Sequence, residues 1–143
     1  MRIDEEVVQG RIDLIMDNLD VLEEMALMDA PEFTDSKRDV LAAKHALQES
    51  IESSLDIAGH IIAAKGFRRP RDYKDIFKVL REENIIDEKL SVRLQEMAKF
   101  RNLLVHQYSV IENQRVHEIL REDVNDIKEY VKHVLVYVKN QKD

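Results

Sequence analysis

Apolar residues recur along most of the chain at alternating spacings of three and four, which is the period of an amphipathic α-helix. The first such stretch runs from Asp4 to about Asp29, and Asp4 is the expected N-cap. Its stripe consists of Val8, Ile12, Ile15, Leu19, Leu22 and Ala26. Other apolar residues widen this face beyond what one neighbour would cover: Val7, Leu14, Val21, Met25 and Met28. The pattern predicts a long first helix that packs on both sides.

A break is expected at 30–33, because Pro31 cannot continue a helix. A second long helix should begin near residues 34–36, where Ser36 and Asp39 have the spacing of a capping box. Gly66 is a typical C-terminal stop. The buried stripe between them is Val40, Leu47, Ile51, Leu55, Ala58 and Ile62.

The second half of the chain predicts one short helix and two longer ones. The short helix covers about 73–83 and ends near Asn84, after which two isoleucines enter the core. Asp87 then caps a helix that continues to about Val105.

A loop is expected at 108–112, and Asn113 should cap a single last helix. The stripe of that helix is Val116, Leu120, Val124, Ile127, Val131, Val134 and Val138. The predicted fold class is therefore all-α, an up-and-down bundle of four main helices plus one short helix.

Composition supports one helical domain over residues 1–143. Three glycines and two prolines leave few sites for strands and turns, and the absence of cysteine excludes disulfides and thiolate chemistry. Neither a signal peptide nor a membrane-spanning run is evident, which predicts a soluble, cytoplasmic protein with no membrane partner. A formal net charge of -7 argues against generic high-affinity binding to nucleic acid, so any such contact must be local or brief.

Candidate chemistry concentrates where the fourth predicted helix ends. Arg101 supplies a charged fork suited to phosphate, His106 can move protons near neutral pH, and Tyr108 offers a hydroxyl. Arg101 and His106 lie about 140° apart on an ideal helix, so they share a face only if the helix ends or a second subunit completes the site. Asn102 can face the same way as His106. The alternative for each residue is a surface ion pair or a helix cap.

The second helix carries an unusual polar group formed by Ser53, Asp56 and His60. Asp56 and His60 are four residues apart and share a face, so they are candidates to support the same cleft or to form a hydrogen-bonded pair at a helix crossing. They supply two potential metal ligands without a third nearby, and no metal is expected. No Gly-x-Ser-x-Gly elbow or glycine-rich phosphate loop occurs.

One concentrated basic run stands out in this acidic chain. It contains Lys65, Arg68, Arg69 and Arg71. Such a run is often only a solvated loop, but its charge makes it the best candidate for steering a polyanion such as RNA.

The segment Arg101-Asn102-Leu103-Leu104-Val105-His106-Gln107-Tyr108 resembles the Arg-x-x-x-x-His-x-Tyr motif of the HepT family, the HEPN-domain toxins of HepT–MntA toxin–antitoxin modules. The segment from Leu55 to His60 is similar to the family's Asp-Ile-Ala-x-His segment, and the turn at 85–87 before the motif helix is also typical. The basic loop around Arg68 departs from the pattern.

This resemblance implies a HEPN-like, metal-independent endoribonuclease without a cofactor, which acts as a homodimer with both motifs facing one cleft. Arg101 and His106 would be the catalytic pair. Tyr108 would accept AMP from a cognate MntA-like nucleotidyltransferase antitoxin, and the added bulk and charge would repel RNA. The wide apolar face of the first helix fits a two-fold interface. The rival hypothesis is a non-catalytic binding module that pairs with a nucleotidyltransferase and presents Tyr108 or a nucleotide to it.

Overall fold

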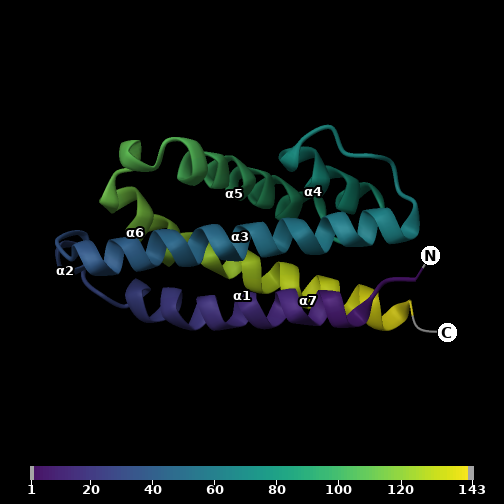
Figure 1. Cartoon of the computed structure of the whole chain (residues 1–143), viewed down its shortest axis with the longest axis horizontal. Helices are drawn as coiled ribbons and strands as arrows, with labels where there is room; N and C mark the ends of the chain where they lie inside the picture. Colours follow the sequence, from purple (N-terminus) through teal and green to yellow (C-terminus); the bar gives the residue numbers. More distant parts are fainter. Residues whose placement is uncertain (1, 142–143) are drawn as a thin grey trace.

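The computed structural model describes residues 2–141, and its regular structure is entirely helical within them. The long helices are α1 (Glu5–Ala26), α3 (Lys37–Lys65), α5 (Glu88–His106) and α7 (Val124–Asn140). The short elements are α2 (Ala30–Thr34), α4 (Tyr73–Glu82), the 3-10 turn η1 (Tyr108–Val110) and α6 (Asn113–Glu122). The long helices alternate in direction along the bundle (Figure 1), which confirms the all-α, up-and-down prediction.

Side-chain caps fix where the main helices begin, as the sequence predicts. The Asp4 carboxylate accepts hydrogen bonds from the backbone N–H groups of the first turn of α1, and the Ser36 hydroxyl accepts one from Asp39. Asp87 caps α5 in the same way. Gly66 ends α3 with φ +68, a left-handed conformation that glycine adopts without steric cost.

The expected interruption between the first two long helices is present, but residues 30–33 are helical and the chain turns on either side of them. Residues 30–34 form the short helix α2, because Pro31 lies in its first turn, where its missing N–H would have no helical partner anyway. The Phe33 side chain is fully buried and stacks on the ring of His117 from α6, with 5.1 Å between the ring centroids. This single turn of helix therefore anchors the connection between α1 and α3 to the core.

The single last helix is a wrong prediction. A turn at Asp123 divides it into α6 and α7, although every member of the predicted stripe is buried. Glu112 occupies the N-cap position of α6, whereas the Asn113 side chain donates to the carbonyl of Thr34 at 3.2 Å. The predicted loop before it contains η1. The break lets α6 pack on α2 while α7 packs on α5.

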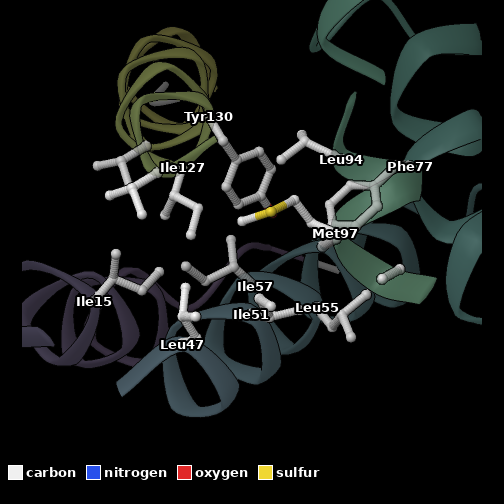
Figure 2. Packing of buried hydrophobic residues seen from close by; sticks show 14 of the residues in the cluster. Ile15, Leu47, Ile51, Leu55, Ile57, Phe77, Leu94, Met97, Ile127 and Tyr130 are labelled. Atoms are coloured by element: carbon white, nitrogen blue, oxygen red, sulfur yellow. The ribbon is translucent and has the colours of Figure 1, made fainter. Parts of the chain in front are cut away.

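The core lies between α1, α3, α5 and α7 and determines how the motif helix sits. Figure 2 shows Tyr130 of α7 beside Met97 of α5 and close to Phe77 of α4. The rings of Tyr130 and Phe77 meet edge to face with centroids 5.7 Å apart, and the Tyr130 hydroxyl donates to the Ser54 carbonyl at 2.8 Å. Burial raises the pKa of Tyr130, so its hydroxyl stays a donor. These contacts join α3, α4 and α7.

The wide apolar face of α1 is covered only in part. Met25 packs against the core, but Val7 and Val21 remain 44% and 39% exposed. Leu14 lies between them along the helix and is half-buried. No helix in the described part of the chain is long and apolar enough to span a bilayer.

Candidate functional site

The motif residues Arg101, His106 and Tyr108 lie in the C-terminal part of α5 and in the turn that follows it. Phe100 and Leu104 are buried and fix this end of α5 to the core. The helix ends when Gln107 leaves the helical conformation, with φ -135 and ψ 44, while its N–H still bonds to the Leu103 carbonyl at 2.8 Å. Tyr108 then begins η1. A change of backbone direction therefore separates His106 from Tyr108.

Arg101 points from α5 toward α3 and is held on several sides. Its side chain is only 16% exposed, and Nη2 lies 3.3 Å from a carboxylate oxygen of Glu52 on α3. Nη1 donates to the Asn102 side chain at 3.2 Å, and the guanidinium lies 4.8 Å from the ring centroid of Tyr73. Nε is buried without a hydrogen-bond partner. The guanidinium is oriented and retains unused donor capacity.

A row of polar side chains on α3 faces this part of α5. Gln48 donates to the same Glu52 carboxylate at 3.1 Å, and Lys44 lies one turn further toward the N-terminus of α3. The Lys44 ammonium lies 4.3 Å from the ring centroid of Tyr108. Because α3 and α5 run in opposite directions, Glu52 lies next to Arg101 at one end of this row, and Lys44 lies next to Tyr108 at the other end.

His106 and Tyr108 are both exposed, which distinguishes them from Arg101. Tyr108 is 38% exposed. Neither the His106 ring nor the Tyr108 hydroxyl has a hydrogen bond or an ion pair to another described residue. Both groups are therefore available to a molecule from solvent.

Within one chain, the Arg101 and His106 side chains do not share a face of α5. The helix α5 continues without interruption through both residues, so their side chains leave it in different directions. No hydrogen bond or ion pair among the described residues joins them, and Asn102, which bonds to Arg101, lies between their directions on the helix. One copy therefore holds the three motif residues near one another without assembling them into a single contact.

The polar group on α3 turns toward α1 instead. Asp56 forms an ion pair with Arg11 at 3.6 Å, and the Nε2 atom of His60 accepts a hydrogen bond from the backbone N–H of Asp4 at 2.9 Å. Ser53 is buried. The contacts of Asp56 and His60 thus connect α3 to the beginning of α1, and none of them reaches Arg101.

The basic run is largely engaged by partners on α4 and at the end of α7. Arg68 forms a bidentate pair with Asp75, both bonds at 2.8 Å, and also bonds to Glu82. The guanidinium beside it holds the pKa of Asp75 well below its usual range. Arg71 lies 3.6 Å from the same carboxylate, and Lys65 donates to Gln141.

Arg69 is exposed and has no ion pair within the described chain. Together with the mostly exposed Arg71 side chain, it supplies the accessible charge of the run. Arg68 and its two carboxylates, in contrast, form a structural clamp between the loop and α4.

Four residues next to the motif were not predicted from sequence: Lys44, Gln48, Glu52 and Tyr73. Three of them recur every fourth residue on α3 and therefore share a face, which is a detectable pattern. Nothing local in the sequence indicates that this face lies against the end of α5, because that depends on packing. No cluster of three or more His, Asp or Glu side chains suited to a metal occurs among residues 2–141.

An antiparallel helical bundle that presents an Arg-x-x-x-x-His-x-Tyr segment at the end of one helix is the arrangement expected for the HepT resemblance. The family model described as "Ribonuclease HepT-like" matches residues 15–134, which include α3 and the whole motif. The chain belongs to the HepT-like ribonuclease family.

Named relatives and solved structures agree with this membership. The chain is 32% identical over 103 residues to a putative RNase of Archaeoglobus fulgidus, with 72% of this chain and 74% of the relative covered. It is 29% identical over 85 residues to the mRNA nuclease HepT of Shewanella oneidensis, with 59% of this chain covered. That match spans 64% of the relative, less than two thirds of its length.

The fold resembles that of a tri-AMPylated Shewanella oneidensis HEPN toxin solved in complex with an MNT antitoxin. The TM-score is 0.83 at 22% sequence identity, and the match covers 91% of this chain and 97% of that chain. At this identity the likeness establishes the fold, and it confirms the HEPN-like bundle.

Proposed function

We propose that this protein is the toxin of a HepT–MntA type toxin–antitoxin pair and acts in the cytoplasm as a metal-independent RNA endonuclease. The observation that carries the proposal is the position of Arg101, His106 and Tyr108 within a matched ribonuclease family domain. Two relatives named as an mRNA nuclease and a putative RNase support the substrate class.

Arg101 and His106 would divide the chemistry between charge and proton transfer. The Arg101 guanidinium, oriented by Glu52 and Tyr73, would bind the scissile phosphate and offset the charge that develops on it. The exposed His106 imidazole would take the proton of the ribose 2′-hydroxyl or protonate the leaving oxygen. Asn102 would fix the guanidinium from the side that faces His106.

In a homodimer these two groups would not need to share a face of one helix, because Arg101 of one copy could act with His106 of the other. The exposed Val7 and Val21 on α1, with the half-buried Leu14 between them, provide an apolar surface that a second copy could cover. Asp56 and His60 border that same helix and would help to shape the interface rather than the cleavage chemistry.

Tyr108 would be the acceptor of AMP from an MntA-like nucleotidyltransferase antitoxin. The residue is exposed, and the tri-AMPylated HEPN toxin bound to an MNT antitoxin is similar in fold. A nucleotide attached two residues beyond His106 would add negative charge beside the cleft and repel an RNA backbone. Arg69 and Arg71 would steer RNA toward the molecule, with smaller contributions from Lys65 and from Arg68.

The test is cleavage of single-stranded RNA by the purified chain in the presence of excess chelator. We expect the parent to cut and His106→Ala to lose at least about 100-fold in rate, the range typical of removing a general acid–base group. The exposed His45, which lies near Glu49 on α3, supplies the matched control, and His45→Ala should cut like the parent. Equal cleavage by His106→Ala and the parent would refute the assigned role.

One observation favours the rival hypothesis of a binding module. The Arg101 guanidinium is mostly buried and already paired with a carboxylate, as expected for a structural ion pair. Such a module would bind a nucleotidyltransferase and present Tyr108 without cutting RNA. It predicts no cleavage by the parent in any buffer, together with AMP transfer to Tyr108 that survives His106→Ala.

A further inference from the structure

Lys44 is a buried cation that lies against the side chain of Tyr108. It is 6% exposed, and its ammonium donates to the Tyr108 backbone carbonyl at 3.3 Å. The same ammonium lies 4.3 Å from the centroid of the Tyr108 ring. No carboxylate lies within ion-pairing distance of it among residues 2–141.

This arrangement leaves the ammonium incompletely compensated. Lysine is rarely buried unless it is paired, because removal of its charge from water is costly. A carbonyl oxygen and the face of an aromatic ring supply part of that compensation, but an ammonium has three donors and only one of them is used here. An anion brought to this position would gain a charge-assisted hydrogen bond.

The position of Tyr108 decides which anion can reach Lys44. The ring covers the ammonium, so a phosphate on an independent RNA strand would have to displace it. A phosphate attached to the hydroxyl of that same ring needs no displacement, because it is carried on the group that the ammonium already contacts. Tyr108 is 38% exposed, and no described residue forms a hydrogen bond with its hydroxyl that would compete.

We propose that Lys44 is the phosphate-binding residue of the Tyr108 site and holds the phosphodiester formed when Tyr108 accepts AMP. This inference rests on the proposed AMP transfer. In that transfer the Tyr108 oxygen bonds to the α-phosphorus of ATP, and the bond from that phosphorus to the oxygen bridging to the β-phosphate breaks. Pyrophosphate leaves, and the phenolic proton passes to solvent. Lys44 then exchanges its bond to the Tyr108 carbonyl for one to a non-bridging phosphate oxygen.

The proposal gives the modified state a defined geometry. Lys44 and Glu52 lie eight residues apart on α3, a separation of about 12 Å along the helix. A phosphodiester held by Lys44 would thus be fixed about two turns from the carboxylate that contacts Arg101. The attached nucleotide would be anchored beside the motif instead of sampling solvent freely.

Phosphotyrosine incorporated at position 108 tests Lys44 without any transferase. A ³¹P NMR titration reports the second ionisation of this phosphate, which ordinarily has a pKa of about 6. An ammonium in contact should lower that pKa by about one unit, a tenfold change in proton affinity, in the parent and in Lys44→Arg. Lys44→Gln should restore the ordinary value. The control Lys65→Gln removes an exposed lysine at the opposite end of α3 and should titrate like the parent.

Identical titration of Lys44→Gln and the parent would overturn the proposal. A second measurement needs no Lys44 variant. When position 108 carries phosphate, the ¹⁵N NMR signal of the Lys44 ammonium should shift, and the exchange of its protons with water should slow. An unmoved signal counts against the proposal equally.

Intact mass after incubation with ATP and an MntA-like nucleotidyltransferase tests the source of the anion separately. No added AMP on the parent would refute the acceptor role of Tyr108, whereas the phosphotyrosine titration judges Lys44 alone.

Discussion

The Glu52–Arg101 pair makes a specific prediction about RNA affinity. Glu52→Gln removes one negative charge from the side of the guanidinium but keeps the shape of the side chain and its ability to accept a hydrogen bond from Gln48. If Arg101 binds an RNA phosphate, this carboxylate and the phosphate must share one guanidinium. The substitution should therefore strengthen binding of RNA.

The distances around Arg101 set the expected size of this change in RNA affinity. The carboxylate lies 3.3 Å from Nη2, and a phosphate oxygen on another edge of the guanidinium would lie about 3 Å beyond it, which gives a charge separation of about 6 Å. The Glu52 side chain is 39% exposed, so the effective dielectric constant is closer to that of water than to that of a core. For values of about 40 to 80, Coulomb's law gives a repulsion of about 0.7–1.4 kcal/mol. That energy corresponds to a threefold to tenfold lower Kd.

The assay is fluorescence anisotropy with a labelled single-stranded RNA, in a His106→Ala background that prevents cleavage. We expect the gain at low salt to shrink as salt rises, since the Debye length falls to about 8 Å at physiological ionic strength. Glu49→Gln is the matched control: it removes the same charge one turn away, where the carboxylate bonds to Asn18 of α1. Its effect should be clearly smaller.

Unchanged or weaker binding by Glu52→Gln at low salt would refute the reasoning. It would mean that no RNA phosphate approaches Arg101, or that loss of the ion pair lets the guanidinium leave the position in which it binds. The salt dependence separates these outcomes, because a displaced but accessible arginine would still contribute to the slope.

Three further predictions concern the bundle that carries the site. Tyr130→Phe removes a buried hydrogen bond to the Ser54 carbonyl and should destabilise by about 1 kcal/mol, seen as a Tm lower by about 3–5 °C in calorimetry; an unchanged Tm would contradict it. Gly66→Ala should cost about 1 kcal/mol in urea unfolding from its φ of +68 alone, because an added Cβ meets no atom within 4 Å. Arg68 lowers the folded-state pKa of Asp75, so the resulting stability is present above about pH 4 and is lost as pH falls toward the folded value. Arg68→Gln should therefore reduce the fall of the unfolding free energy between about pH 4 and lower pH. An identical fall in the variant and the parent would exclude the pair as its cause.

Periodicity and capping chemistry were sufficient to predict α1, α3 and α5, because each of these helices is specified by local signals. Asp4, Ser36 and Asp87 cap the helices they were expected to cap, and Gly66 ends the helix it was expected to end. The break at Asp123 had no such signal. The apolar spacing runs through it from Leu120 to Val124 without a change of phase, and the turn reflects packing of α6 against α2.

The site shows the same division between local and non-local information. The motif could be found from sequence because Arg101, His106 and Tyr108 fall within eight consecutive positions at one helix end. Its neighbours on α3 could not be assigned, since Glu52 and Lys44 meet α5 and η1 only through packing of distant segments. Asp56 and His60 share a face of α3 as expected, and within one chain that face contacts α1, which the sequence did not indicate.

The segment at 107–112 is held in place by contacts at both of its ends. On one side it follows the end of α5, which is packed in the core. On the other side the Asn113 side-chain amide donates a hydrogen bond to the carbonyl of Thr34, next to the buried Phe33. The backbone that carries Tyr108 is therefore tied to α5, to α2 through Asn113 and to α3 through Lys44, so a group attached to its hydroxyl would keep a defined place on the surface of the bundle.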